Sequence, residues 1–266
     1  MIIRDLITAV VRKLRNRTEL SGVIPYYLAS ALLDLTENIE TEQLKVTGPQ
    51  ANFIVQQAEY PLRGYDITGV NGNPFVASNE HRITMVTSWF VWFDTSGSPV
   101  VGQSTGKNID KRDERTVIPM SKILGIPSYF TFQGDKKTNG KIIVGQMPDN
   151  PYACQMRYQR EHPFGIPFDK VPASLDDSSL ANQLAQSQVY IDHDWVDILT
   201  TYAAEKAGYD VGLNEISSQY HQQLFGYKDK KGTEFPGLIM AKQTQQERNS
   251  QFNSRQLRPS VRRYTG

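Results

Sequence analysis

The chain has 266 residues and a formal net charge of +1, and this length suits one large domain or two small ones. Its single cysteine, Cys154, excludes an internal disulfide, as is usual in a reducing compartment. No apolar run approaches the roughly 18 residues of a membrane span, and Arg4, Asp5 and Arg12 interrupt the apolar N-terminus, which excludes a signal-peptide core. We therefore expect a soluble, unprocessed protein without a membrane partner.

Helical periodicity marks the first 43 residues. Pro25 suits the first turn of a second helix, and the polar residues 16–19 separate it from the first. We expect a helical hairpin over residues 1–43, while the basic residues from Arg12 to Arg17 suit either a solvated face or a contact surface. The predicted apolar faces are Ile3, Leu6, Ile7, Val10, Val11 and Leu14 in the first helix, and Leu28, Leu32, Leu35 and Ile39 in the second.

Residues 44–170 change to short apolar runs separated by turn residues, which predicts an inserted antiparallel β domain. Three consecutive strands, a meander, are expected in the second half of this domain, and the longest strand is expected at 82–93. Residues 117–124 fit a strand end or a short helix, and residues 94–115 fit a long loop. The predicted strands are 52–56, 82–93, 129–133, 141–147 and 152–160.

Alternation in the strand at 152–160 predicts one buried and one wet face. Tyr152, Cys154, Met156 and Tyr158 share the apolar face, so we expect Cys154 to be a buried thiol rather than a nucleophile. The polar residues Gln155, Arg157 and Gln159 are expected on the wet face.

The C-terminal part, residues 171–232, returns to helical spacing. Asp192, His193 and Asp194 offer caps for a helix that carries Trp195, and Ala203, Ala204 and Ala207 permit close packing. A last helix is expected to end near Gly226. We predict an α+β fold in which the N- and C-terminal helices form a bundle and the β domain is inserted between them.

The segment 233–266 is predicted to be an extended basic tail. Residues 241–266 contain six basic residues and one acid, a net charge of +5, so the remainder of the chain carries −4. The segment is polar and poor in apolar residues, so we expect it to order only on a partner.

A search for catalytic or cofactor-binding patterns gives no positive result. The glycine loops at 134–141 and 102–107 have the wrong length and lack a following helix for phosphate binding. Asp192, His193 and Asp194 are adjacent, so their side chains diverge and fit helix caps better than a shared metal. We expect no enzyme activity, no catalytic residue, no metal and no cofactor.

Four aromatic residues lie close together on the longest predicted strand: Trp89, Phe90, Trp92 and Phe93. They fit core packing or an interface with a neighbouring subunit. They also fit nucleobase stacking, but no basic residue lies between Trp89 and Gly106 to contact the phosphates.

The order of the parts resembles the head-to-tail adaptor proteins, or neck proteins, of short-tailed bacteriophages. The resemblance spans nearly all of residues 1–240 and depends on the order of individually weak motifs. These are Arg15–Leu20 in the helical pair, Gln57–Leu62, Gly125–Phe130 with Gly134-Asp135, Met147–Asp149, Arg157-Tyr158, the Trp195 helix with its alanines, and the Tyr220 helix. The segment from Arg82 to Arg115 looks longer than in the simplest adaptors, which leaves its role open.

This resemblance implies a virion protein, made in the cytoplasm of the bacterial host, that forms a ring of usually twelve subunits at the head-tail junction. Its implied partners are the portal protein, tail nozzle or fibre proteins, and double-stranded DNA that passes through the lumen without sequence recognition. In this family a C-terminal extension often reaches the portal, a role that we assign here to the basic tail. The alternative is a nucleic-acid-binding protein that uses this tail. The expected portal-docking residues are Arg248, Arg255, Arg258, Arg262, Arg263 and Tyr264.

Overall fold

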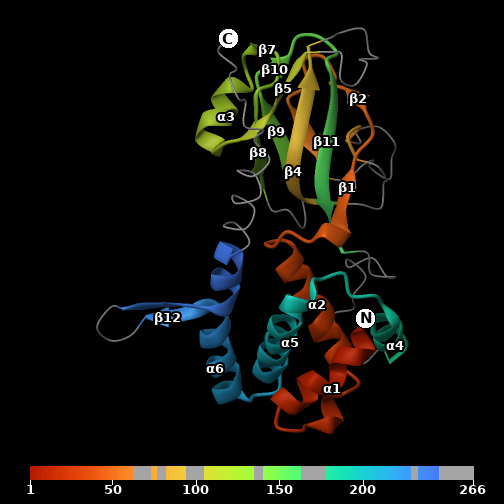
Figure 1. The fold of residues 1–266 in the computed structure, drawn as a ribbon, viewed down its shortest axis with the longest axis vertical. Helices are drawn as coiled ribbons and strands as arrows, with labels where there is room; N and C mark the ends of the chain where they lie inside the picture. Colours follow the sequence, from red (N-terminus) through yellow and green to blue (C-terminus); the bar gives the residue numbers. More distant parts are fainter. Residues whose placement is uncertain are drawn as a thin grey trace, which may run out of the picture. The chain divides into compact units, whose positions relative to one another are not determined.

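The chain has an α+β fold that divides into two compact units (Figure 1). The computed structural model describes residues 1–62, 73–76, 82–93, 105–134, 140–162, 178–228 and 233–245. The helical unit comprises Met1–Leu35 and Phe164–Gly266, and the β unit comprises Thr36–Pro163. None of the helices in the described ranges combines the length and hydrophobicity that a bilayer crossing requires.

The boundary between the units falls earlier than the sequence predicted, because polar contacts join residues 36–41 to the β unit. The side chain of Gln159 donates to the carbonyl oxygens of Thr36, at 2.5 Å, and Ile39, at 2.9 Å, and it accepts from the Thr41 amide at 2.7 Å. Gln159 is fully buried, so the prediction that it lies on a wet strand face is wrong. The buried amide of Gln159 is stable because the backbone of residues 36–41 provides its hydrogen-bond partners.

In the described part of the chain, the helical unit has two helices before the β unit and, after it, three helices and the helical segment at 238–245. The first pair was predicted, whereas the helix that begins at Ser178 was not. The helices are α1 (Ile3–Lys13), α2 (Ile24–Thr36), α4 (Ser178–Gln186), α5 (Val196–Asp210) and α6 (Asn214–Phe225), with 3-10 turns η1 (Thr18–Leu20) and η4 (His193–Trp195).

Helix α5 packs against α1, α2 and α6. Ala203, Ala204 and Ala207 are fully buried, as their small side chains predicted. Polar contacts fix the neighbours, since Lys13 Nζ lies 2.9 Å from Asp197 Oδ1 and Lys206 Nζ lies 2.6 Å from Asp34 Oδ2. The alanines allow close approach of the helices, and these ion pairs at the edges orient them.

The segment predicted as a tail begins with ordered structure. Strands β12 (Gly226–Lys228) and β13 (Glu234–Pro236) form an antiparallel hairpin, and residues 238–245 are helical. Lys242 Nζ lies 3.4 Å from Asp194 Oδ2. The prediction that this segment orders only on a partner is therefore wrong for residues 233–245, because β13 pairs with β12 and Lys242 contacts Asp194 within the same chain.

The described part of the β unit contains two larger sheets, whose side chains form one core, and a two-stranded sheet. The first sheet has β1 (Lys45–Thr47) and β2 (Ala51–Asn52) beside β11 (Ala153–Arg160), followed by β4 (Ile83–Trp92) and β5 (Gly106–Asn108). The second sheet has the order β3 (Glu59–Pro61), β9 (Lys141–Gly145), β8 (Tyr129–Gln133) and β6 (Asp110–Lys111). The chain passes from the first sheet to the second between β2 and β3 and again between β5 and β6.

Several predicted strands take a different place or form. The three C-terminal strands are not a meander, because β8 pairs with β9 whereas β11 pairs with β4 in the other sheet. Between β9 and β11, Gln146 has a positive φ of 63° and starts the short strand β10 (Met147–Pro148), which pairs with β7 (Leu124–Gly125). The chain thus leaves one sheet before it joins the next.

Two loop regions also differ from the predictions. The expected strand at 52–56 stops at Asn52, since Gln56 adopts a positive φ of 62° in a turn. The expected loop at 94–115 contains β5, β6 and the start of helix α3 (Glu114–Met120), which Asp113 caps through a 2.7 Å hydrogen bond from the Arg115 amide. The chain passes between the two sheets from β5 to β6, and both strands are too short to show the alternation of apolar and polar residues that predicts a strand.

Candidate interaction surfaces

The predicted aromatic cluster on β4 is mostly part of the core. Trp89 is fully buried, and its ring centroid lies 5.5 Å from that of Phe53 and 5.8 Å from that of Phe130. Trp92 is also buried, so neither tryptophan can stack on a nucleobase. Phe90 is half-buried and Phe93 is exposed. An interface role stays a prediction for these last two, and Trp89 fits the alternative of core packing.

The predicted portal-docking residues, from Arg248 to Tyr264, lie outside the described part of the chain. The described chain reaches residue 245, at the end of a helical segment on the helical unit. Residues 246–266 of the basic tail lie beyond the described residues, and the docking role of its arginines stays a prediction.

A hairpin with exposed aromatic side chains lies at the C-terminal end of α6. Tyr227 and Phe235 face each other across β12 and β13, with ring centroids 4.8 Å apart and ring planes inclined by 15°. Their side chains are 48% and 44% exposed. In Figure 1 the hairpin projects sideways from α6. A stacked, half-exposed aromatic pair on a projecting ribbon has the composition of a protein-protein contact. We call β12 and β13 the aromatic hairpin.

The β unit exposes apolar side chains at one of its ends, where two loops meet. Ile54 and Val55 lie in the turn after β2, and the Gln56 amide in that turn donates to the Pro148 carbonyl of β10 at 2.8 Å. Strand β10 pairs with β7, which brings Ile123 and Leu124 to the same end. All four side chains are between 43% and 55% exposed. We call this group the apolar end of the β unit.

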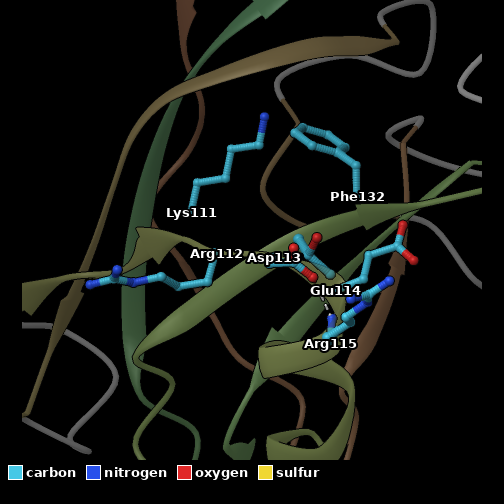
Figure 2. A pocket seen from close by; sticks show the side chains of 7 residues that line it. Lys111, Arg112, Asp113, Glu114, Arg115 and Phe132 are labelled. Atoms are coloured by element: carbon cyan, nitrogen blue, oxygen red, sulfur yellow. Dashed lines mark hydrogen bonds between the residues drawn. The ribbon is translucent and has the colours of Figure 1, made fainter.

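A wide hollow of about 790 Å³ lies beside β6 and the start of α3. Figure 2 shows that Lys111 and Phe132 point to the same side, whereas Arg112 points away from them. The Lys111 ammonium lies 5.6 Å from the Phe132 ring centroid. Lys111, Arg112 and Arg115 are balanced by the acids at 110, 113 and 114. The hollow is open, and its lining residues carry a net charge of only +1, which Asp110 beside Arg112 offsets, so it lacks the strong positive charge that a nucleic-acid groove requires.

A polar cluster joins β5 to the segment that leads into β8. Lys107 Nζ donates to Ser128 Oγ at 2.5 Å, and Ser128 Oγ lies 2.7 Å from Gln146 Oε1. Burial lowers the pKa of Lys107. A lysine beside a serine can activate a nucleophile, but here both groups bond neighbouring backbone and amide oxygens, which ties the two sheets together. Sequence reasoning missed this cluster because its members lie in three separate segments.

Other predicted candidates for chemistry take structural places. Cys154 is fully buried, as predicted, and burial raises the pKa of its thiol. The predicted capping role of Asp192, His193 and Asp194 is wrong, because Asp192 is the N-cap of η4 without a side-chain capping bond and Trp195 is the N-cap of α5; His193 and Asp194 are exposed. Within the described ranges, no three His, Cys, Asp or Glu side chains are grouped so that they could hold a metal ion. The glycine loops at 102–107 and 134–141 lie partly outside these ranges.

The β unit contains a buried ion-pair group that the sequence did not indicate. Arg82 is 4% exposed and contacts Glu37 and Glu161, each at 2.8 Å. Burial alone would lower the pKa of Arg82, but the bonds and charges of Glu161 and Glu37 raise it. These three residues join the start of β4, the end of β11 and the entry segment.

Comparison of the chain with protein-family models and with curated proteins finds no match.

Proposed function

We propose that the protein is a structural component of a virion, a ring adaptor that connects the portal to the tail and surrounds the passing DNA. The observation that carries this proposal is that each unit exposes its own apolar surface. The helical unit exposes Tyr227 and Phe235 on the aromatic hairpin, and the β unit exposes Ile54, Val55, Ile123 and Leu124 at its apolar end. A subunit that links two neighbours in an assembly needs at least two such surfaces.

The division of the chain supports the same proposal. The two chain ends build one unit and the middle builds the other, which is the arrangement that the resemblance to adaptors implies. The helix at 238–245 is followed in the sequence by the arginines of the basic tail, which begin at Arg248. A cationic segment that starts from an ordered helix can bind the carboxylates of a portal surface through the forked hydrogen bonds of its arginines.

The test is electron microscopy of the full-length chain with and without the isolated portal ring encoded by the same genome, beside a chain that ends at Gln245. This truncation keeps the helix at 238–245 intact. We expect a ring that docks on the portal only when the tail is present. A matched variant should dock more weakly, because lysine keeps the positive charge but cannot form the forked hydrogen bonds of arginine. In this variant Lys replaces Arg248, Arg255, Arg258, Arg262 and Arg263.

Two outcomes would count against the adaptor. A chain that forms no oligomer and no complex with the portal contradicts it directly. A chain that ignores the portal and binds DNA through the same tail, with strong salt dependence, supports the nucleic-acid-binding alternative instead.

A further inference from the structure

The exposed side of α1 carries a row of hydrogen-bond donors. Arg4, Thr8 and Arg12 are exposed and follow each other at intervals of four residues, so they lie on one side of the helix. Arg15 and Asn16, also exposed, extend this row past the end of α1. We call these five residues the arginine stripe. The sequence alone left open whether its basic residues form a solvated face or a contact surface.

The acidic side chains next to the stripe already have partners in their own segments. Asp5 accepts a hydrogen bond from the Ile2 amide at 2.9 Å, and Glu19 pairs with Arg17 at 3.1 Å. These two are the acids of residues 1–20, which also contain five basic residues and so carry a net charge of +3. The first helix is therefore strongly positive.

The arginines of the stripe have no acidic partner in the described part of the chain. Arg12 and Arg15 make no ion pair with any described residue. Arg4 lies against the neutral side-chain amide of Gln186, which accepts hydrogen bonds from it when the amide oxygen faces α1. Three positive charges along α1 are thus left without a counter-charge.

The helices after the β unit have the opposite charge. Residues 178–228 contain two lysines against six acids, a net charge of −4. Within the described residues of the helical unit, a polyanion is therefore attracted to α1 and repelled by α5 and α6.

The composition of the stripe indicates the class of partner. A protein-protein contact has an apolar centre, but no large apolar side chain of residues 2–20 is exposed. Single-stranded nucleic acid is bound by stacking of its bases on aromatic rings, and residues 1–20 contain no aromatic residue. Guanidinium, hydroxyl and amide donors suit the phosphate oxygens of a duplex, which carry no sequence information.

The length of the stripe fits a row of phosphates. The eight residues from Arg4 to Arg12 rise about 12 Å along the helix axis. Each strand of duplex DNA places one phosphate per about 3.4 Å of its axis, so this distance covers roughly three to four phosphates. The arginines can therefore each contact a different phosphate of one strand.

Arg15 has an unfavourable backbone conformation. Its φ is 58° and that of Asn16 is 62°, and the Asn16 amide donates to the Val11 carbonyl oxygen at 2.9 Å. Asparagine tolerates this left-handed region, whereas arginine rarely adopts it and glycine would adopt it without strain. Strained residues of this kind cluster at functional sites, and this one belongs to the stripe.

The end of α1 is fixed to the rest of the helical unit. Leu14 is fully buried, and Lys13 Nζ lies 2.9 Å from Asp197 Oδ1. The Tyr220 hydroxyl of α6 donates to the Lys13 carbonyl oxygen at 2.9 Å. The backbone that carries the stripe is thus held in place before a ligand arrives, which lowers the entropic cost of binding.

We propose that the arginine stripe contacts the phosphate backbone of double-stranded DNA, without reading its base sequence. This inference rests on the proposed ring adaptor and names the surface of each subunit that contacts the passing DNA. A ring repeats the stripe in every subunit, so individually weak contacts add along one duplex. Because only phosphates are contacted, the duplex can slide.

The salt dependence of DNA binding tests the stripe on the full-length chain. Each phosphate contact contributes about 0.9 to the slope of log affinity against log salt, so Arg12→Gln with Arg15→Gln should reduce the slope by about 2. Fluorescence anisotropy of a labelled duplex between about 50 and 200 mM salt measures it. The control, Lys122→Gln with Arg157→Gln, removes two exposed charges from the β unit and should leave the slope unchanged.

One substitution separates binding from stability. Arg15→Gly removes a charge of the stripe and suits the left-handed backbone, so it should lower the slope by about 1 and leave the melting temperature no lower than in wild type. A lower melting temperature with an unchanged slope would make Arg15 a structural residue of the turn and would remove it from the DNA contact.

Photo-cross-linking locates the DNA on the full-length chain. A benzophenone attached to Thr8→Cys should link the chain to duplex DNA on illumination. The same label on Gln222→Cys, at an exposed position of α6, should not. The native Cys154 is buried and stays unlabelled.

The outcomes separate the DNA contact from the ring. A slope lowered only in the stripe variants, with cross-linking only from position 8, supports the contact. Equal slopes in the stripe and control variants, equal cross-linking from positions 8 and 222, or no DNA binding by wild type overturns it and leaves the adaptor function standing. Loss of portal docking with an unchanged slope assigns the stripe to a protein partner instead. A chain that forms no oligomer and no complex with the portal overturns the adaptor, whatever its slope.

Discussion

The cores of the two units are built in different ways. In the helical unit, α5 lets its neighbours approach through Ala203, Ala204 and Ala207, residues that are close in sequence. In the β unit, Trp89 packs against aromatic rings from segments far apart in sequence, among them Phe53 and Phe130. Local spacing therefore specifies much of the helical core, whereas the β core depends on which strands meet.

The largest expected effect is the loss of the central ring of the β core. Trp89→Ala should lower the free energy of unfolding by about 3–5 kcal/mol, because it leaves a cavity among Phe53, Phe75 and Phe130. Urea unfolding followed by circular dichroism measures it. Phe93→Ala, at the exposed end of the same segment, is the control and should cost much less; equal losses would contradict the assignment of Trp89 to the core.

The next effect tests the polar contacts that close the β unit. Arg82→Met should cost about 3 kcal/mol, because it leaves the largely buried carboxylates of Glu37 and Glu161 without their cation. Lys141→Met, which removes an exposed pair with Glu59, should cost less than about 1 kcal/mol. The triple variant Arg82→Met, Glu37→Leu, Glu161→Leu should recover most of the loss in thermal unfolding. A triple variant that is less stable than Arg82→Met would show that the charges themselves are needed.

A smaller effect is expected from overpacking the helical core. Ala204→Leu adds a branched side chain at a fully buried position of α5 and should cost about 1–3 kcal/mol. Ala241→Leu, at an exposed position of the helix at 238–245, should change stability by less than about 0.5 kcal/mol. Equal melting temperatures of the two variants would mean that α5 has room for larger side chains.

A further effect is a pH dependence that belongs to the β unit. Burial, followed by the charge of Arg160, lowers the pKa of His162 to about 3. An unfolded histidine binds its proton below about pH 6.5, so between pH 6.5 and 3 the unfolded chain holds the extra proton. The free energy of unfolding should therefore fall as pH is lowered, by up to about 1.4 kcal/mol per pH unit.

Urea midpoints measured between pH 7 and pH 4 test this slope. His162→Phe should reduce it, whereas His193→Gln, at an exposed position of the helical unit, should leave it as in wild type. The same slope in wild type and His162→Phe would assign the acid sensitivity to other groups.

The predicted helices and long strands depend on patterns that a single segment contains. The spacing of Ile3, Leu6, Val10, Val11 and Leu14 is enough to predict α1 and its buried face. Helix α4 was missed because the prolines before it and its polar residues conceal a short amphipathic pattern. Strands β5 and β6 have three and two residues, too few for a visible alternation of apolar and polar residues.

The candidate surfaces were harder to predict than the fold. Trp89 and Trp92 were predicted as interface candidates because aromatic residues are common in interfaces. Aromatic residues are just as common in protein cores, where these two lie. Tyr227 and Phe235 attracted no attention, since Tyr227 follows the end of the last predicted helix and Phe235 is a lone aromatic in a polar segment. They become one surface only when β12 pairs with β13.

The sequence by itself determined the α+β class, the interruption of helical ends by a β region, the helices with strong periodicity and the burial of Cys154, because these depend on spacing within one segment. Only the tertiary structure decided that β11 joins β4 rather than β9, that Gln159 binds the entry segment, and that the aromatic hairpin is exposed while Trp89 is not. Pairing between distant segments decides such features, since burial of a side chain depends on what the rest of the chain places against it.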